Sequence, residues 1–493
     1  MSGRGPPSHR NGRLAVAVAG GPASLAVALA RFGYDVSLFV TEDWSDDDHA
    51  ACRRQGVRVI SAPRLDVVVA SRWLTESYQL YRALRGSRYD AIVFEGHDAY
   101  CTVRAKQLDI DFDSAAVVAH FDGPSEPRLE SLSKSRVGEL ATDRLVLELA
   151  DGLVCDAEAA EWWTRRGWPL PSRRHLRSGG EGEAEDAAGW AEVLRPPAER
   201  PRRRAVRGRV SVVVPFHERT AYLHLCLEAL SKQTYSDLEV LVADDGSVSQ
   251  SAKEYLGELR SREWPWPLRI LDLPHSGVAA ARNEGARAAS GELVLFVDDD
   301  DVPFENLAEV LVRGISSSGA DVVAAGARVF RSEAVPDPYP GDKVTIPFGE
   351  PREFGLLGNH FGPQTCLWRR SAFEEVGGFR DVFVEDWDIL ARAALRGARI
   401  VGTPEPLYWY RVAPAGRFTG ATLERRLEAR SAIAEAYAEH LPDGMHLLPL
   451  LVAAAYGQVE SHERDTQPPR SMIRRAASRA RSVYARAAAG RVS

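Results

Sequence analysis

Residues 291–301 read GELVLFVDDDD, an apolar run of strand length that ends in four consecutive aspartates. A short run of leucine, valine and phenylalanine is typical of a buried strand in a parallel sheet. Four adjacent carboxylates repel one another unless a cation or hydrogen-bond donors compensate them. The stretch therefore predicts a strand and, directly after it, a site that gathers positive charge.

The residues that precede these aspartates show a repeating pattern. Short apolar runs alternate with stretches of helical length: strand VSVVV from Val210, helix 221–233, strand LEVLVA, helix 251–262, strand LRILDL and helix 278–289. Alternation of this kind predicts a doubly wound α/β domain around a parallel sheet. We place this domain at residues 209–420.

Acidic residues follow three of its predicted strands. The first ends in PFHE at 215–218, the second in DDGS at 244–247 and the fourth in the aspartate run. Ligands of open parallel sheets gather at the carboxyl ends of the strands, so we expect these clusters to converge. Aspartates can also cap a helix, and Asp-Gly is common in turns, so a purely structural role for 244–247 stays open.

A divalent ion is the simplest compensation for the aspartate run. Mg²⁺ or Mn²⁺ held by one or two carboxylates completes its octahedron with waters and substrate phosphates. The cluster therefore points to a diphosphate ligand. Arg282, early in the helix at 278–289, has a guanidinium suited to phosphate or carboxylate. A surface ion pair is the alternative for this arginine.

A second acidic group lies further along, in the stretch GGFRDVFVEDWD at 377–388 before a predicted helix at 389–396. Its carboxylates could cap that helix. They could also include a general base, which the attack of a sugar hydroxyl on an anomeric carbon requires. Both interpretations stay open on the sequence.

Taken in order, these motifs resemble a family 2 glycosyltransferase with the GT-A fold. The resemblance runs from VSVVVPFHER through LVADDGS, HSGVAAARNEGARAASGELVLFVDDDD and the 369–397 stretch to PLYWYR at 406–411. It implies inverting transfer from a nucleoside-diphosphate sugar, usually with Mg²⁺ or Mn²⁺. The histidine that often follows the Tyr-Arg pair in that family is absent after Arg411, which leaves a metal role for this region in doubt.

The resemblance also implies roles for particular residues. The donor would be bound by Pro215, Phe216, Glu218, Asp244, Asp245, Arg282, Asp298 and Asp299. The first three would line the nucleoside pocket, Asp244 or Asp245 would hydrogen-bond the base, and the others would lie near the ribose, diphosphate and sugar. Asp300 would bind the metal, and Asp386 would be the catalytic base, with Glu385 and Asp388 supporting it or meeting the acceptor.

The first segment, residues 12–168, shows a similar alternation and predicts a second parallel sheet flanked by helices. Its apolar runs lie at 14–19, 36–40, 57–60, 91–95, 115–119 and 152–155, with a helix-like stretch at 73–84. It resembles the N-terminal half of a GT-B glycosyltransferase of the family 4 kind. Because no matching second half follows, we expect it to bind or dock the acceptor, although binding of NAD stays an alternative for its glycine-rich first turn. His97 and His120 could touch that acceptor or be ordinary core or surface histidines.

Two segments lack this alternation. Residues 169–208 are rich in proline, glycine, glutamate and arginine, and we predict a linker there. Residues 421–493 are predicted to form a helical extension whose end, from Arg470, carries seven arginines and no acidic residue. Such a basic tail could contact an anionic membrane surface, and a solvated tail is the alternative.

Length and composition limit the number of domains, the kinds of partner and the cellular compartment that we expect. With 493 residues the chain is too long for one core, and its net charge of -7, 45% hydrophobic and 27% charged residues give no bias toward nucleic acid. Five scattered cysteines without a CxxC pair argue against a disulfide framework. No apolar run suggests a membrane span, so we expect a cytoplasmic protein, with the basic tail as its candidate contact with the inner face of the membrane.

The sequence thus predicts an inverting glycosyltransferase of bacterial glycan, polysaccharide or glycoconjugate biosynthesis. Its partners would be a nucleotide-sugar donor and a glycan, lipid-linked or protein acceptor. A sugar-1-phosphate nucleotidyltransferase is a weaker alternative, because its glycine-rich loop with Arg and Lys is not found after Val214. A non-catalytic nucleotide- or glycan-binding protein would be expected to lack the metal or base carboxylates, and both are present.

Overall fold

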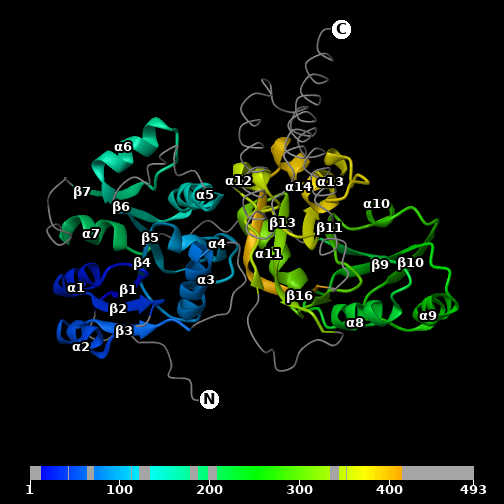
Figure 1. Cartoon of the computed structure of the whole chain (residues 1–493), viewed down its shortest axis with the longest axis horizontal. Coiled ribbons are helices and arrows are strands. Elements are labelled where there is room, and N and C mark those ends of the chain that lie inside the picture. The colour runs from blue at the N-terminus through cyan, green and yellow to red at the C-terminus, as the bar shows by residue number, and fades with distance from the viewer. Residues whose placement is uncertain are drawn as a thin grey trace, which may run out of the picture. The chain divides into compact units, whose positions relative to one another are not determined.

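The computed structural model describes residues 13–42, 44–63, 72–112, 114–121, 134–177, 187–197, 208–332, 344–350 and 352–412. These residues fall into two compact units, the first holding those up to 197 and the second those from 208 onward. Each unit is built around a sheet of its own (Figure 1). The mixed α/β fold with parallel sheets is as the sequence predicts.

The first unit holds a seven-stranded sheet in the order β3-β2-β1-β4-β5-β6-β7. Each neighbouring pair runs parallel. The strands are β1 (Ala15–Ala19), β2 (Asp35–Val40), β3 (Arg58–Ser61), β4 (Ala91–Glu95), β5 (Ala116–Phe121), β6 (Gly152–Asp156) and β7 (Arg173–Arg177). The first six form where the sequence predicts strands, and β1 and β5 are buried throughout.

Helices connect these strands and cover the sheet. They are α1 (Ala23–Arg31), α2 (Asp46–Arg54), α3 (Arg72–Leu84), the 3₁₀ turn η1 (Gly96–Ala99), α4 (Tyr100–Gln107), α5 (Lys134–Leu149), α6 (Ala157–Arg165) and α7 (Ala187–Leu194). One apolar core joins Val16 and Val118 of the sheet to Leu25 and Leu29 of α1. Alternation of β-branched strands with amphipathic helices is what creates this core.

The segment 169–208, predicted to be a linker, contains two elements of the first unit. β7 adds to the sheet beside β6, and α7 buries Trp190, Val193 and Leu194. These three side chains recur at helical spacing and so lie on one face, which lets a short helix pack even though its surroundings are polar. The prediction failed because the many charged residues of this segment outweighed one apolar stripe.

The second unit holds a nine-stranded sheet whose main path is β10-β9-β8-β11-β15-β13-β16-β12, with β14 beside β13. Its strands are β8 (Val210–Phe216), β9 (Leu238–Asp245), β10 (Leu268–Leu273), β11 (Leu293–Phe296), β12 (Val302–Pro303), β13 (Val322–Phe330), β14 (Val344–Thr345), β15 (Cys366–Arg369) and β16 (Ile400–Arg411). β8 to β11 run parallel to one another. The sheet is mixed, however, because β15 is antiparallel to both β11 and β13.

The helices of the second unit are α8 (Thr220–Leu230), α9 (Gln250–Ser261), α10 (Val278–Ala288), α11 (Leu307–Ser318), α12 (Arg352–Leu357), α13 (Arg370–Val376) and α14 (Glu385–Leu395). The helices predicted before the aspartate run correspond to α8, α9 and α10. A core of aromatic side chains joins α13 and α14 to the sheet, with Phe296, Trp368, Phe373, Phe379 and Trp387 all buried. This packing fixes α14 against the strands that precede the aspartates.

The predicted helical extension at 421–493, with its basic tail, lies outside the described residues. Within the part of the chain that the structure describes, no helix combines the length and the apolar character needed to cross a membrane.

Candidate active site

The acidic strand ends of the second unit meet at one edge of its sheet. β9, β8 and β11 are neighbours and run parallel, so their carboxyl ends lie together. Contacts between the following loops join them further. The Glu218 backbone N–H donates to Ser247 Oγ at 3.0 Å, and Arg219 reaches Asp299. The predicted convergence is therefore present.

The four consecutive aspartates differ in environment. The side chains of Asp298 and Asp300 are 26% and 19% exposed, whereas that of Asp299 is 1% exposed and residue Asp301 is 2% exposed. Successive side chains thus alternate between an open and a buried side. Two carboxylates face outward at this edge, and two are enclosed by the protein.

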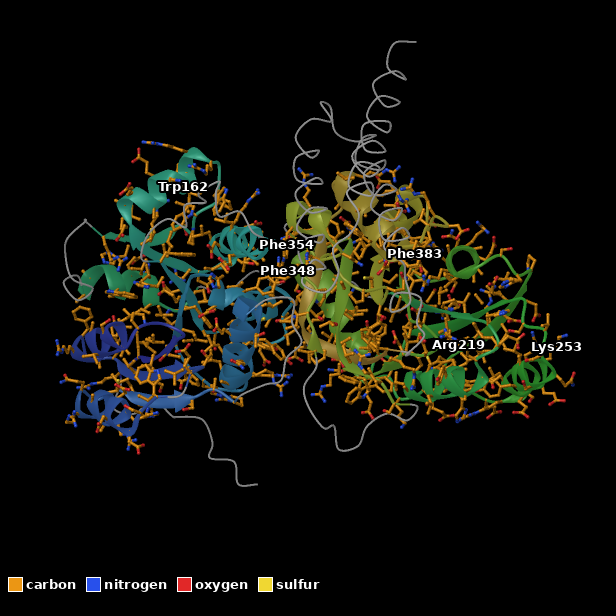
Figure 2. All side chains as sticks on the ribbon, viewed as in Figure 1. Trp162, Arg219, Lys253, Phe348, Phe354 and Phe383 are labelled. Carbon is orange, nitrogen blue, oxygen red and sulfur yellow. The ribbon has the colours of Figure 1, made fainter. Side chains whose placement is uncertain are left out.

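Arg219, labelled in Figure 2, compensates the middle of the run from the start of α8. Its Nε donates to Asp299 Oδ2 at 3.1 Å, its Nη2 pairs with Asp299 Oδ1, and its Nη1 donates to Asp300 Oδ2 at 2.7 Å. Burial nevertheless raises the pKa of Asp299 to about 8, against the opposing charge of Arg219. Burial also raises the pKa of Asp300. The charges of Asp300 and Asp298 add to the rise for Asp299, so the neighbouring carboxylates repel one another even with Arg219 present.

Asp301 is held from β16. The Arg411 N–H donates to Asp301 Oδ1 at 3.3 Å, and burial raises the pKa of this carboxyl well above its ordinary value. The Arg411 side chain donates to the Asp300 and Ser332 carbonyl oxygens and lies over Tyr222. Arg411 thus ties the last strand to the aspartate run.

Asp244 and Asp245 bind backbone groups of neighbouring loops. Asp244 Oδ1 accepts the Ser247 N–H and Oγ–H, which is the turn role left open by the sequence. Asp245 Oδ1 accepts the N–H groups of Ser276 at 2.7 Å and Gly277 at 3.1 Å, at the start of α10. Gly277 has a φ of 92°, a conformation that favours glycine.

Two histidines lie beside Asp245. The rings of His217 and His275 stack with centroids 4.6 Å apart, and the Nδ1 of each lies within hydrogen-bond distance of the Asp245 carbonyl oxygen. His275 Nδ1 is also 3.0 Å from Asp245 Oδ2. Both histidines are exposed, so they offer a flat polar surface at this edge.

The other residues predicted to line the nucleoside pocket are buried or make hydrogen bonds within the protein. Pro215 and Phe216 end β8 and are buried. Glu218 has a φ of 65°, and its Oε1 accepts the N–H groups of Val248 at 2.5 Å and Ser249 at 3.1 Å. Hydrogen bonds from Ser249 and Val248 lower the pKa of Glu218 to about 2. These residues shape the loop from within.

Arg282 links the aspartate run to α14. Its Nη2 donates to Asp298 Oδ1 at 2.5 Å and its Nη1 to Glu385 Oε1 at 3.1 Å. Its side chain is only 3% exposed and lies over the Phe379 ring. The alternative of a surface ion pair is wrong, because burial and two carboxylate partners make this arginine a fixed bridge.

Asp386 lies near the start of α14 beside Glu385. Its Oδ1 accepts the Trp387 N–H and its Oδ2 accepts the Asn359 side-chain amide, each at 2.8 Å. Burial raises the pKa of Asp386 to about 6, and the charge of Glu385 adds to that effect. A carboxylate with such a pKa is suited to accept a proton near neutral pH.

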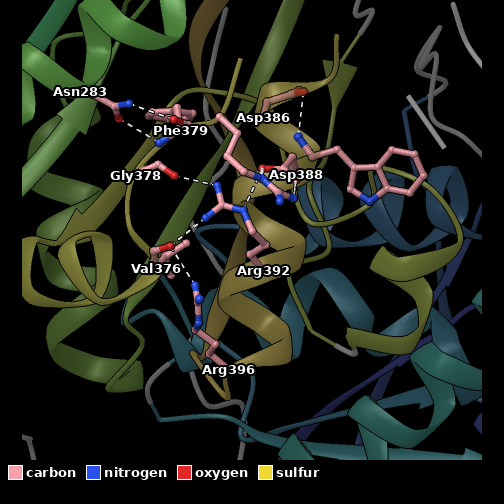
Figure 3. Close-up of polar contacts among 10 residues, drawn as sticks. Asn283, Val376, Gly378, Phe379, Asp386, Asp388, Arg392 and Arg396 are labelled. Carbon is pink, nitrogen blue, oxygen red and sulfur yellow. Dashed lines mark hydrogen bonds and ion pairs between the residues drawn. The ribbon is translucent and has the colours of Figure 1, made fainter. Parts of the chain in front are cut away.

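Asp388 has a different environment (Figure 3). It is fully buried and binds Arg392 Nε at 2.8 Å and Arg380 Nε at 3.0 Å through Oδ2. Arg392 also donates to the carbonyl oxygens of Val376 at 2.8 Å and Gly378 at 2.6 Å. Asp388 therefore fixes the loop before α14, and contact with a substrate is closed to it in this arrangement.

Asn283 fixes the same loop from α10, as Figure 3 shows. Its side chain donates to the Phe379 carbonyl at 2.9 Å and accepts the Phe379 N–H at 2.8 Å. A Cβ on Gly378, whose φ is 73°, would lie 2.5 Å from Asn283 Oδ1. This close approach explains the second glycine of the Gly377-Gly378 pair.

Several residues of this edge were missed by the sequence analysis: Arg219, His217, His275, Asn283, Asn359 and Arg411 as a partner of the aspartates. Their partners lie far away in the chain, so no spacing reveals them. Arg219 could have been suspected, because it directly follows Glu218 at a strand end that faces an uncompensated aspartate run.

The first unit has an acidic edge of its own at the ends of β4 and β5. His120 is buried, and its Nδ1 lies 2.8 Å from Glu95 Oε2. His97 Nδ1 is 3.5 Å from Asp143 Oδ1. Against burial, which lowers it, the contact with Asp143 raises the pKa of His97 to about 9. Burial raises the pKa of Asp98 to about 7, and Oδ1 of that residue has no hydrogen-bond partner among the described residues.

Comparison with known proteins concerns the second unit most directly. Residues 211–377 match the model of the family described as glycosyl transferase family 2. This segment contains each residue expected to bind donor or metal, whereas Glu385, Asp386 and Asp388 lie beyond its end. The match agrees with the resemblance predicted from the motifs. No such match bears on the GT-B-like prediction for the first unit, which stays a prediction.

Curated relatives are glycosyltransferases too. The chain is 36% identical to the glycosyltransferase GlyG of Streptococcus pneumoniae serotype 4 over 115 residues, 23% of this chain and 37% of that protein. It is 27% identical to the uncharacterized glycosyltransferase EpsJ of Bacillus subtilis over 218 residues, 42% of this chain and 61% of that protein. The matches thus span less than two thirds of either relative.

Two solved structures show some likeness to the chain. One is the mannosyltransferase PcManGT from Pyrobaculum calidifontis in complex with GDP-Man and Mn²⁺, at 20% identity, a TM-score of 0.40, and 58% of this chain and 76% of that chain covered. The other is S. aureus TarS 1-349, at 19% identity, a TM-score of 0.39, and 52% and 73% covered.

Proposed function

We propose that this chain is an inverting glycosyltransferase that moves a sugar from a nucleoside-diphosphate sugar to an acceptor hydroxyl. The observation that carries the proposal is the bridge made by Arg282. It connects Asp298 with Glu385. Asp298 belongs to an acid-rich strand end suited to a metal-bound diphosphate, and Glu385 is next to Asp386, whose pKa is raised. The family match over 211–377 supports the donor half of this arrangement.

The residues at the aspartate edge fit a divalent metal ion. Asp298 and Asp300 turn carboxylate oxygens outward, and such oxygens are the preferred ligands of Mg²⁺ and Mn²⁺. The neighbouring carboxylates of Asp300 and Asp298 repel that of Asp299 although Arg219 is present, and a further cation would relieve this repulsion. We assign Asp300 as the metal ligand, with Asp298 and Asp299 near the ribose and sugar. When bound, the ion would neutralise the charge that develops on the leaving diphosphate.

The donor nucleotide is assigned to the edge between β8 and β9. Asp244 or Asp245 stays the proposed contact of its base, with His217 and His275 as the exposed surface next to Asp245. Pro215, Phe216 and Glu218 act by holding the loop, and the charge of Arg282 acts near the diphosphate.

The reaction follows from the position and pKa of Asp386. Its carboxylate takes the proton of the acceptor hydroxyl while the hydroxyl oxygen forms a bond to the anomeric carbon. The bond between that carbon and the diphosphate oxygen breaks with its electron pair, so the nucleoside diphosphate leaves. One displacement of this kind inverts the anomeric configuration. Glu385 keeps Arg282 in place, and Asp388 positions α14.

The first unit is proposed to bind the acceptor. Its acidic edge, with Glu95, Asp98 and Asp143 near the ends of two strands, would repel a diphosphate. Carboxylates there suit a hydroxyl-rich ligand instead, because they accept hydrogen bonds from sugar hydroxyls. An acceptor from bacterial glycan, polysaccharide or glycoconjugate biosynthesis fits this chemistry.

A cytoplasmic setting belongs to the same proposal. All five cysteines are free and buried, which suits a reducing compartment. The membrane contact expected of the basic tail lies outside the described residues and stays a prediction.

A donor screen tests the proposal. The melting temperature is measured with UDP-, GDP- and dTDP-sugars, each with Mn²⁺ or with EDTA, because a ligand that binds the folded state stabilises it by mass action. We expect one nucleotide series to raise the melting temperature only when Mn²⁺ is present. Formation of the sugar nucleotide and pyrophosphate from a sugar 1-phosphate and a nucleoside triphosphate would instead favour a nucleotidyltransferase. Binding without any turnover would favour a non-catalytic protein.

A further inference from the structure

Arg219 occupies an unusual place for an arginine next to an expected metal ligand. Three of its nitrogens contact the aspartate run, and two of these go to one carboxylate, that of Asp299. The third, Nη1, makes a single hydrogen bond of 2.7 Å to Asp300 Oδ2. The guanidinium therefore has a two-point anchor on a buried residue and a one-point contact with a half-buried one.

We propose that Arg219 is a built-in counterion that competes with the divalent metal for Asp300 and, once displaced, binds the donor diphosphate. The inference rests on the proposed function, since it takes Asp300 as the metal ligand. It assigns a role to a residue that neither the sequence motifs nor the proposed reaction otherwise uses.

Competition follows from the geometry of the Asp300 contact. A hard divalent ion binds through carboxylate oxygen lone pairs, and Nη1 uses one oxygen of the same carboxylate. Two cations at one carboxylate also repel each other. Metal binding is therefore linked to loss of the Nη1 contact, and the apparent affinity for metal alone is lower than the carboxylates by themselves would give.

The displaced group stays within the site because the Asp299 anchor is separate. Asp299 is 1% exposed, so its bond to Nε and Nη2 is protected from water, whereas the Arg219 side chain as a whole is 48% exposed. A small rotation about that anchor frees Nη1 without releasing the guanidinium. A planar guanidinium held in this way is suited to bind a phosphate oxygen of a donor that arrives with the metal.

The alternative is that Arg219 only stabilises the fold by neutralising Asp299. In that case its removal would loosen the aspartate edge, and the affinities for metal and for nucleotide would fall together. The competition model predicts opposite changes in these two affinities, which makes the two explanations separable in one variant.

The experiment measures Mn²⁺ binding to the full chain by electron paramagnetic resonance, first without nucleotide. Wild type is compared with Arg219→Gln, Arg219→Lys and the control Arg260→Gln. Arg260 also pairs with an aspartate in the second unit, Asp272, and at 45% its side chain is about as exposed as that of Arg219. UDP, GDP and dTDP are then titrated in turn at saturating Mn²⁺.

We expect Arg219→Gln to bind Mn²⁺ about tenfold more tightly than wild type without nucleotide, a factor that corresponds to about 1.4 kcal/mol. The same variant should bind the preferred nucleoside diphosphate about tenfold more weakly. Arg219→Lys keeps a cation but loses the paired guanidinium nitrogens, so its affinities for Mn²⁺ and nucleotide should lie between those of wild type and Arg219→Gln. Arg260→Gln should match wild type.

Equal or weaker Mn²⁺ binding by Arg219→Gln would overturn the inference, as would unchanged nucleotide binding. If that variant melts too early to be measured, tighter Mn²⁺ binding by Arg219→Lys supports the inference and unchanged binding overturns it. If the proposed function itself is wrong, the binding measurements give a different result. In that case Asp300→Asn would bind Mn²⁺ as wild type does, and the preferred nucleotide would bind equally with EDTA.

Discussion

At the scale of single residues, the aspartates at 298–301 show how neighbours of one type acquire different roles. They form a tight turn after β11, in which the Asp301 N–H donates to the Asp298 carbonyl oxygen, and Asp298 and Asp300 face outward while Asp299 and Asp301 are enclosed. Each carboxylate then meets a different partner. The sequence analysis could predict a site for positive charge here, but not which aspartate faces which partner.

Replacing the half-buried Asp300 tests the metal assignment. We expect Asp300→Asn to reduce the affinity of the nucleotide sugar in Mn²⁺ by about 10²-fold or more, because the neutral amide is a poor ligand for a hard cation. Isothermal titration with and without Mn²⁺ measures this. Asp272→Asn, on an exposed residue of β10, is the control. Wild-type affinity in Asp300→Asn would move the metal elsewhere.

The pH dependence of turnover tests Asp386 as a base. Its ordinary pKa of 3.8 is raised to about 6, so the ionised form that can accept a proton is lost as the pH falls through 6. We expect kcat to be level above about pH 7 and to fall about tenfold for each pH unit below 6. Steady-state rates between pH 4.5 and 8.5 measure the profile, and a level rate down to pH 5 would contradict it.

At the scale of elements, α14 and the loop before it depend on a buried charge network. Asp388 of α14 binds Arg392 and Arg380, and Arg392 carries the network on to two carbonyl oxygens of the loop. Asn283 of α10 clamps the next residue of the loop. The carboxylate of Asp386 is thus positioned by a framework that residues close in the sequence build together with the distant Asn283.

Breaking this network should lower the stability of the fold more than it lowers the rate of sugar transfer. We expect Asp388→Asn to lower the free energy of unfolding by on the order of 3 kcal/mol, because two arginines lose a buried counter-charge. Urea denaturation of this variant is compared with Asp381→Asn, an exposed aspartate near the same helix. An unchanged unfolding midpoint together with a raised KM for acceptor would show that Asp388 contacts substrate after all.

Elements with regular periodicity were predictable, and irregular ones were not. β8 to β11 and α8 to α10 follow an alternation of apolar runs and helical stretches that the sequence displays openly. β15 was not predicted because it is antiparallel to both of its neighbours and lies outside the alternation of parallel strands and helices. α7 was not predicted because its apolar stripe is surrounded by charge. The roles of Arg219 and Asn283 were not predicted because their hydrogen-bond partners lie 80 and 96 residues away in the sequence.

At the scale of the whole molecule, the chain combines two units with acidic strand ends of different character. The second unit surrounds its aspartates with arginines, and the first unit surrounds His97 with carboxylates. Arginine side chains such as these can bind phosphate, whereas carboxylates without a metal favour hydroxyl groups. The difference supports a division of labour between donor and acceptor.

A variant of the first unit tests this division. We expect Asp98→Asn to leave hydrolysis of the donor within about twofold of wild type while transfer falls by about tenfold, because only the acceptor loses a contact. The ratio of transfer to hydrolysis is measured on the acceptor that gives the fastest turnover in a glycan screen. Asp47→Asn, on the exposed side of α2, serves as control. Equal losses of hydrolysis and transfer would contradict the division.

The central claim is that the second unit performs the sugar transfer with Asp386 as its base. Donor affinity and single-turnover rate, measured together on Asp386→Asn with saturating Mn²⁺, test it most directly. The account predicts donor binding within about twofold of wild type and a rate lower by about 10²-fold or more, since only proton removal is lost. A rate near that of wild type with intact donor binding would contradict the claim.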